Sequence, residues 1–176
     1  MTPRPQSQRG IALITVLILL VVMSLLAIIS LRTTLMEERM AANMMDRSLS
    51  FQAAEAALRE GETVAGGKPQ GAQLAADCTN GLCTAPVAAD APRWTDEDVW
   101  TKARTTSVNL GTKTAAAKFY VEFLANNVPA RGTCTTTEDV SPDATCTQLE
   151  WRYRVTARSQ ADGRAAVILQ TTYAVP

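Results

Sequence analysis

Four cysteines are the residues whose type and spacing could do chemistry in this chain, and all four follow a long apolar segment near the N-terminus. They are Cys78, Cys83, Cys134 and Cys146, and they lack the paired CxxC spacing of a zinc site. An even number of cysteines beyond a membrane segment favours two disulfides in an oxidising compartment. Of the three possible pairings we expect Cys78–Cys83 and Cys134–Cys146, because each closes a short polar loop. Four free or metal-binding thiols are the alternative.

Catalytic chemistry finds little support in the other residues. The chain has no histidine, which removes the commonest general base and metal ligand, so a serine or aspartate nucleophile would have no obvious base. The acidic stretch Thr95-Asp96-Glu97-Asp98 predicts a helix start with Thr95 as the N-cap. A calcium loop is the weaker alternative, because the glycine and terminal glutamate of an EF-hand are missing. We therefore expect no enzyme, no metal and no cofactor.

The charge balance also narrows the choice of partners. Lysine plus arginine and aspartate plus glutamate number 17 each, and no basic patch stands out. This argues against nucleic acid as a partner. Apolar residues make up 47% of the chain, but the N-terminal segment takes many of them, so the remainder predicts a small soluble domain.

The apolar segment, residues 11–31, carries no charge and lies between Arg9 and Arg32. At ~1.5 Å per residue it spans roughly 31 Å as a helix, which matches the apolar core of a bilayer. A secretory signal has a shorter apolar core followed by a small-residue cleavage site, and no such site follows here. Because Arg4 and Arg9 precede the segment, the N-terminus is expected in the cytoplasm and the remaining chain on the far side of the membrane.

The helical pattern continues beyond the membrane segment. Residues 32–60 contain neither glycine nor proline, and Gly61 then supplies a stop signal. One stripe at helical spacing is apolar apart from Arg47, which predicts a packed face rather than a cofactor site. The stripe comprises Met36, Met40, Met44, Phe51, Ala54 and Leu58.

Strands are expected late in the chain. Residues 119–123 and 149–158 alternate apolar and polar side chains, as half-buried strands do. A turn at Asp162-Gly163 leads to a third strand at residues 167–173. These strands predict an α+β fold in which a small antiparallel sheet packs its apolar face on the second half of the long helix.

Two further regions give less information. Residues 62–117 contain loop signals but no clear strand. The polar face of the strand at 149–158 carries Arg152, Arg154 and Arg158, which we interpret as a solvated sheet face rather than an anion site.

The N-terminus carries a family likeness. A short basic leader ending in Gly10, followed by Ile11-Ala12-Leu13-Ile14 and the long apolar run, resembles the class III signal of type IV prepilins. The resemblance implies that a dedicated peptidase removes residues 1–10 and methylates the new N-terminal Ile11. The apolar run would then survive as an anchor and later as part of the pilus core.

Two longer strings are similar to the N-terminal region of PilX-type minor pilins. They are ERMAAN at residues 38–43 and FQAAEAALR at residues 51–59, and the likeness covers residues 1–60. It implies a pilin-like domain organisation: leader 1–10, membrane and pilus-core helix 11–31, amphipathic helix 32–61, and a periplasmic domain 62–176 with a C-terminal hairpin.

The resemblance also implies a role. A minor pilin waits in the inner membrane, primes pilus assembly, and then lies at or near the pilus tip outside the cell, supporting pilus biogenesis, twitching motility and adhesion. Its partners would be other minor pilins and the major pilin, through their N-terminal helices, a large tip adhesin and the prepilin peptidase. Subunit packing would involve Thr15, Met36, Met40, Met44 and Phe51.

The chain departs from the common pilin pattern at two positions. Thr15 stands where most pilins carry glutamate, and Arg32 stands where many carry proline. Both departures favour a specialised minor subunit. Two alternatives stay open: the tip pseudopilin of a type II secretion system, and a bitopic membrane protein whose periplasmic domain binds a ligand.

Overall fold

The computed structural model describes residues 11–110, 113–130, 148–160 and 165–176. Gly10, Cys134, Cys146 and the predicted turn at 162–163 lie outside the described residues. The chain divides into two compact units, residues 1–44 and 45–176, and each is described by itself.

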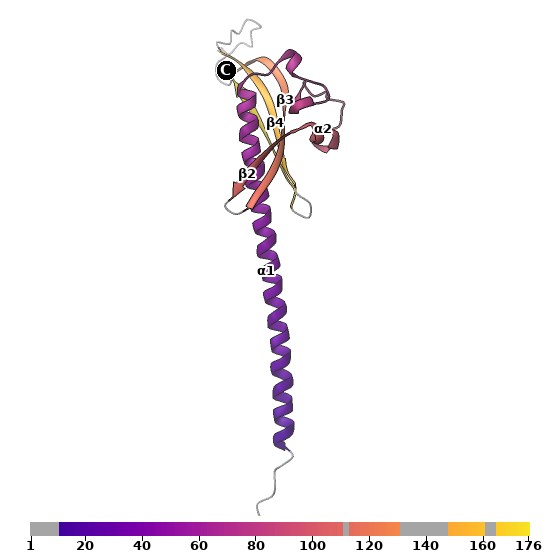
Figure 1. Ribbon diagram of the computed structural model, residues 1–176, viewed down its shortest axis with the longest axis vertical. Helices are drawn as coiled ribbons and strands as arrows, with labels where there is room; N and C mark the ends of the chain where they lie inside the picture. The colour runs from indigo at the N-terminus through magenta and orange to yellow at the C-terminus, as the bar shows by residue number, and fades with distance from the viewer. Residues whose placement is uncertain (1–10, 111–112, 131–147, 161–164) are drawn as a thin grey trace, which may run out of the picture. The chain divides into compact units, whose positions relative to one another are not determined.

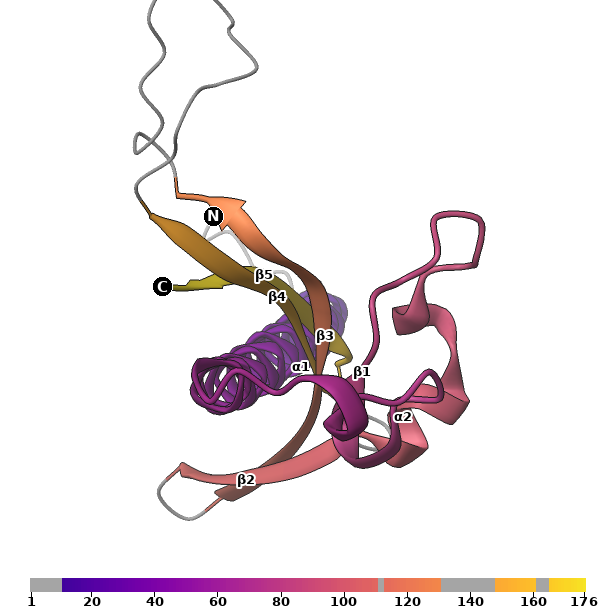
Figure 2. The same cartoon turned by 90° about the horizontal axis from the view of Figure 1, so that it is seen from above.

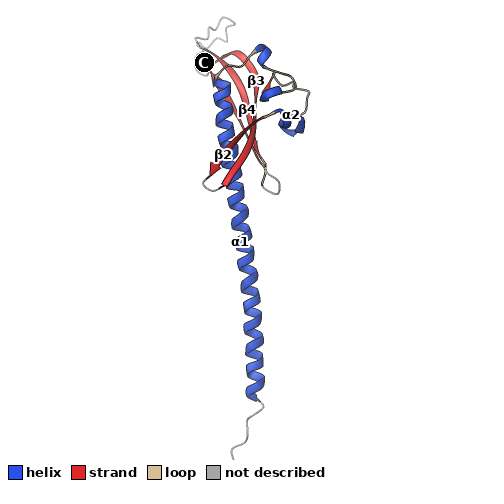
Figure 3. Cartoon of the chain, in the orientation of Figure 1, coloured by secondary structure: helices blue, strands red, loops and turns tan. Residues whose placement is uncertain are grey.

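Helix α1, Ile11–Gly66, contributes to both units (Figure 1; Figure 3). The predicted stop at Gly61 is wrong, since the helix continues past it. It ends at the Gly66-Gly67 pair, where Lys68 adopts a left-handed φ of 51° and its N–H bonds to the Ala65 carbonyl at 2.9 Å. Gly61 is buried instead, so it serves packing rather than termination.

The described residues of the second unit form one sheet of five strands. They are β1 Leu82–Cys83, β2 Arg104–Leu110, β3 Lys113–Pro129, β4 Leu149–Ser159 and β5 Val167–Val175. The order is β1-β3-β4-β5, and β2 also pairs with β3; only β1 runs parallel to its neighbour. The two strands predicted from alternation and the third predicted after a turn are confirmed as β3, β4 and β5, and the α+β class with them. β2 was missed because RTTSVNL is polar and lacks a clear apolar alternation.

One face of the sheet packs on the 45–66 part of α1 (Figure 2). The helix contributes small residues to this core, including Ala53, Ala57 and Ala65. The sheet contributes larger ones, among them Phe119 and Val155. Small side chains let the helix axis approach the sheet closely, so the large side chains of the strands fill the space between them.

The predicted packed stripe therefore needs correction. Ala54 is buried and Leu58 is partly buried against the core, but Phe51 is 47% exposed. The methionines are more exposed still; Met36, Met40 and Met44 retain 71%, 64% and 73% of their surface. The sheet uses the neighbouring small-residue face, because large side chains would hold it away from the helix.

The segment between α1 and β2 covers part of the other face of the sheet (Figure 2). This segment includes three short 3₁₀ turns, at Gly71–Gln73, Thr79–Gly81 and Arg93–Thr95. It ends in helix α2, Glu97–Lys102, whose N-cap is Asp96 and not the predicted Thr95. The Asp96 carboxylate accepts a hydrogen bond from the Asp98 N–H at 2.9 Å, whereas the Thr95 hydroxyl donates to the Pro92 carbonyl.

A second core forms under this segment. It is composed of Cys78, Cys83, Val99, Trp100 and Tyr120. The Trp100 and Tyr120 rings meet edge to face, with centroids 5.1 Å apart. The sheet is therefore buried on both faces along part of β3.

Candidate functional site

The described part of the first unit is the N-terminal part of α1, which is apolar over residues 11–31 and carries charges beyond them. Its part of α1 contains the candidate membrane span, long and apolar enough to cross a bilayer by length and composition. Hydroxyl groups in the span bond to the helix's own backbone: Thr15 Oγ1 donates to the Ala12 carbonyl at 2.9 Å, and Ser24 Oγ donates to the Val21 carbonyl at 2.8 Å. These bonds allow the two hydroxyls to lie in an apolar environment without a partner subunit.

The residues predicted for subunit packing fall on both units. Thr15, Met36, Met40 and Met44 belong to the first unit and Phe51 to the second. All five are exposed in the isolated chain. The fold uses none of them for its own core, so their apolar surface is available for contact with another molecule.

The predicted bond between Cys78 and Cys83 is confirmed. Both cysteines are fully buried beside Tyr120 in the second core. The bond closes a tight loop in which Cys78 and Asn80 adopt left-handed φ values of 60° and 58°. It thus joins this loop to β1 at the sheet edge. The predicted partner bond, Cys134–Cys146, stays a prediction.

A buried carboxylate fixes the loop before α2 to the sheet. Glu122 of β3 is fully buried, and both carboxylate oxygens are engaged: Oε1 accepts from Arg93 Nη1 at 2.9 Å, and Oε2 accepts from Arg154 Nε at 2.6 Å. Arg93 Nη1 also donates to the Thr84 carbonyl at 2.7 Å. The hydrogen bond to Glu122 raises the pKa of Arg154. Two arginines offset the cost of burying one carboxylate.

Helix α2 is held to β4 by a second ion pair. Arg158 donates two hydrogen bonds to the Glu97 carboxylate, at 2.6 and 2.9 Å, and its guanidinium lies 4.3 Å from the centre of the Trp100 ring. The hydrogen bond from Arg158 lowers the pKa of Glu97. At the far end of α2, the hydrogen bond from Lys102 lowers the pKa of Asp77.

The predicted arginine row is therefore only partly solvated. Arg154 and Arg158 bind carboxylates and pack under the covering segment, whereas Arg152 remains more exposed, 3.9 Å from Glu150. No anion site follows from this row, because the arginines are engaged by carboxylates of the chain itself.

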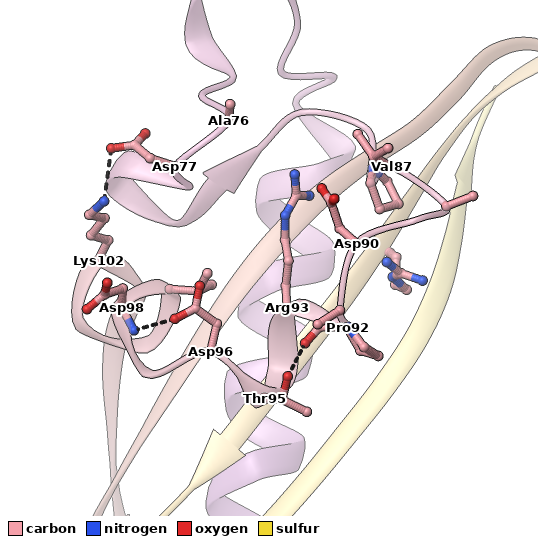
Figure 4. A pocket seen from close by; sticks show the side chains of 15 residues that line it. Ala76, Asp77, Val87, Asp90, Pro92, Arg93, Thr95, Asp96, Asp98 and Lys102 are labelled. Carbon is pink, nitrogen blue, oxygen red and sulfur yellow. Dashed lines mark hydrogen bonds and ion pairs between the residues drawn. The ribbon is translucent and has the colours of Figure 1, made fainter.

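An open pocket of about 1040 Å³ lies between α2 and the loop that precedes it (Figure 4). Its walls carry four aspartates, at 77, 90, 96 and 98, and three cations, Arg93, Lys102 and Arg154. Among the described residues no group of three or more acids, cysteines or histidines is placed to hold a metal ion. Within these walls Lys102 pairs with Asp77. Arg93 and Arg154 instead bind Glu122, and the lining contains no nucleophile paired with a base.

Glu122, Arg93 and Arg154 form a buried group, the Glu122 cluster, which the sequence did not predict. Glu122 and Arg154 each occupy a polar position in a correctly predicted strand, and they face each other directly across β3 and β4. Opposite charges at these positions were a usable signal, but pairing them required the strand register. Arg93 lies in a loop and gave no signal at all.

Comparisons with known proteins agree with this architecture. Residues 9–59 match the model of the PilX N-terminal family, and residues 70–175 match the C-terminal family of the type IV pilus assembly protein PilX. Neither curated proteins nor solved structures gave a match. The matched family is a structural pilin family, not a family of enzymes, and it implies a membrane or pilus location. The two matches cover the long helix and the sheet domain in turn, and the chain belongs to the PilX family of type IV pilus assembly proteins.

Proposed function

We propose that the chain is a minor pilin that helps prime type IV pilus assembly and lies at or near the pilus tip. In that place it supports pilus biogenesis, twitching motility and adhesion. The placement at the tip is supported mainly by Thr15. Its side chain is uncharged, and its hydroxyl donates to the Ala12 carbonyl of its own helix at 2.9 Å.

The argument rests on what this position does in other pilins. The resemblance implies that their glutamate neutralises the N-terminal amine of a neighbouring subunit within the apolar bundle. An ionised side chain at the centre of a membrane helix costs about 2.5–3.5 kcal/mol on insertion scales and needs such a compensating charge. Thr15 carries no charge with which to recruit an amine. A subunit that begins the filament has no neighbour ahead of it and loses nothing.

The life cycle follows from the same assignment. Leader cleavage after Gly10 leaves Ile11 as an N-methylated first residue, and the helix stays in the inner membrane. The domain is then periplasmic, which is consistent with the disulfide between Cys78 and Cys83. The exposed surface that contains Met36, Met40, Met44 and Phe51 contacts the helices of other minor pilins and the major pilin. The prepilin peptidase and a large tip adhesin complete the set of partners.

Mass spectrometry tests processing and placement separately. The mature chain should begin with methylated Ile11, and Gly10→Val should block leader removal while membrane insertion is retained. An intact Met1 in the membrane form of the native chain would overturn the processing step. In sheared pili, quantitative mass spectrometry should find the chain at low copy number. A copy number near that of the major pilin would overturn the tip placement.

The tip pseudopilin of a type II secretion system remains the second candidate, because it shares the leader and can also lack the glutamate. Deletion of the gene separates the two roles. Loss of surface pili with normal protein secretion supports the pilus role, whereas loss of secretion with normal pili supports the pseudopilin. A bitopic ligand-binding protein would leave both processes intact.

A further inference from the structure

The outer edge of β5 is a surface that the proposed role leaves unused. β5 pairs with β4 in unbroken register from Val167 to Val175, and no other described strand pairs with it. It therefore ends the sheet within the described residues. A strand in this position carries a row of backbone N–H and C=O groups that can pair with another chain.

β5 lacks the features that usually protect such an edge. Its sequence, VILQTTYAV, contains no charge and no proline over 9 residues. Each of the other strands longer than two residues carries charge; examples are Arg104 in β2, Glu122 in β3 and Arg158 in β4. Proteins normally place charges, prolines or bulges on long edge strands to prevent pairing. Because β5 has neither charge nor proline, its edge can pair with another strand.

The strands on the opposite side of the sheet are shorter or irregular in their pairing. β3 is paired there by β2 along its first half and by β1 at Val121 and Glu122. Its register with β4 is broken between Phe123 and Ala125 and again before Val128. Bulges of this kind bend a strand and discourage regular pairing. β2, the outer strand on that side, has no described partner on its far side but carries Arg104, whereas β5 is uncharged along its whole length.

Two contacts, one from α1 and one from the loop that follows it, hold both ends of β5 in place. The Asp46 carboxylate accepts a hydrogen bond from the Ala165 N–H at 2.9 Å, just before the strand begins. Lys68 Nζ donates to the backbone oxygen of Pro176, just after it ends. A strand fixed at both ends presents its edge in one conformation, which lowers the ordering cost of binding.

The side chains of β5 define what the edge can accept. Leu169, Thr171 and Tyr173 are half-buried on the helix side, and on the other side Gln170 is exposed and Ile168 is 42% exposed. A strand laid beside β5 would have uncharged neighbours on both faces. A charged side chain in its middle would be desolvated without a partner, which is costly.

We propose that the free edge of β5 accepts an extended, uncharged segment of another protein as an additional antiparallel strand. The orientation follows the antiparallel pairing of β2 to β5. The backbone groups of β5 supply the affinity, and its alternating side chains select a partner strand of matching alternation. The proposal rests on β5 alone and does not depend on placement at the pilus tip.

Amide hydrogen exchange of the full chain in detergent tests the proposal. The probe is a synthetic peptide of alternating valine and threonine with a lysine at each end. Its matched control has proline at alternate positions, which removes amide donors. With the first peptide at saturation, every second amide of β5 should exchange at least about tenfold more slowly, because only outward-pointing N–H groups gain a partner. Amides of β2 should not change.

Two variants separate strand pairing from general adsorption. Gln170→Glu places one charge in the middle of β5 and should abolish the alternating protection. Ser107→Glu places the same charge on an exposed position of β2 and should leave the protection intact. Absence of protection, or protection without the two-residue period, would overturn the proposal. Protection that grows with protein concentration without peptide would also overturn it, because the occupant would then be a second copy of this chain.

Discussion

Gly61 of α1 packs directly against Val155 of β4. A Cβ atom on Gly61 would lie 2.3 Å from Val155 Cγ1 and 3.0 Å from Phe119 Cδ2. Since neither approach is possible without movement, the missing side chain sets the distance between helix and sheet. The glycine is therefore a packing residue inside a continuous helix.

Gly61→Ala should lower the free energy of unfolding. Overpacking of this kind costs about 1–3 kcal/mol, and the better helix propensity of alanine offsets about 1 kcal/mol of it, so we expect a net loss of up to about 2 kcal/mol. Gly66→Ala is the matched control, because no atom lies within 4 Å of the Cβ position there. Urea unfolding of the full chain in detergent measures both. Equal effects of the two substitutions would contradict the packing role.

Glu122→Gln should destabilise the segment between α1 and β2, which Arg93 fixes to the sheet. The substitution keeps the shape of the side chain but leaves Arg93 and Arg154 facing a neutral amide in a buried place, where breaking an ion pair costs about 3–5 kcal/mol. Glu97→Gln, at the exposed end of the Arg158 pair, should cost much less. Hydrogen exchange in residues 84–96 should accelerate in the first variant only. A native exchange pattern in Glu122→Gln would show that the arginines do not hold this segment.

Local patterns in the sequence were sufficient for the elements that face a core on one side. The apolar run at 11–31 and the alternation at 149–158 each identify their element without reference to any other part of the chain. β3 and β4 were predictable for this reason, and β5 was predicted as their partner because a turn signal precedes it. β2 was not, because its polar side chains depend on pairing with β3 rather than on burial.

The burial of the apolar stripe and the contacts of Glu122 could not be predicted from a single sequence. Helical spacing groups Met36 and Phe51 with Ala54 in one apolar stripe, yet of these three only Ala54 is buried. Helical periodicity identifies an apolar face but does not say whether the same chain or another one covers it. The Glu122 cluster similarly required the strand register and the path of the loop that carries Arg93.

The alkaline stability of the domain should depend on Tyr120. Burial raises the pKa of the Tyr120 hydroxyl to about 12 from an ordinary value of 10.0. In the unfolded chain this tyrosine loses its proton near the ordinary value, so between these two pH values the unfolded state binds fewer protons. The free energy of unfolding should then fall as pH rises, by up to about 1.4 kcal/mol per pH unit for this group.

Tyr120→Phe should flatten that slope, because the substituted ring has no proton to lose. Urea unfolding at a series of pH values measures the slope in both chains. Burial also raises the pKa of Tyr153, so part of the slope should remain in the variant. Identical slopes in the two chains would show that Tyr120 ionises normally in the folded state.

Removal of the disulfide between Cys78 and Cys83 should cost about 2 kcal/mol, because a short closed loop limits the entropy of the unfolded chain. The double substitution Cys78→Ala with Cys83→Ala tests this by urea unfolding.

Peptide mapping without reductant should also link Cys134 to Cys146. A peptide that joins either of those cysteines to Cys78 or Cys83 would overturn the local pairing.

Phe51 and Ala54 lie close together on α1 but face different surroundings, which allows assembly to be separated from folding. Phe51 is 47% exposed, whereas Ala54 is fully buried. Phe51→Asp should therefore leave the domain folded, with its unfolding midpoint little changed, but should abolish pilus assembly by placing an unpaired charge in the subunit contact. Ala54→Asp should unfold the domain, because the charge is forced into the core. Circular dichroism measures folding and electron microscopy of cells measures piliation. Normal piliation in Phe51→Asp would mean that this part of the stripe faces solvent in the pilus.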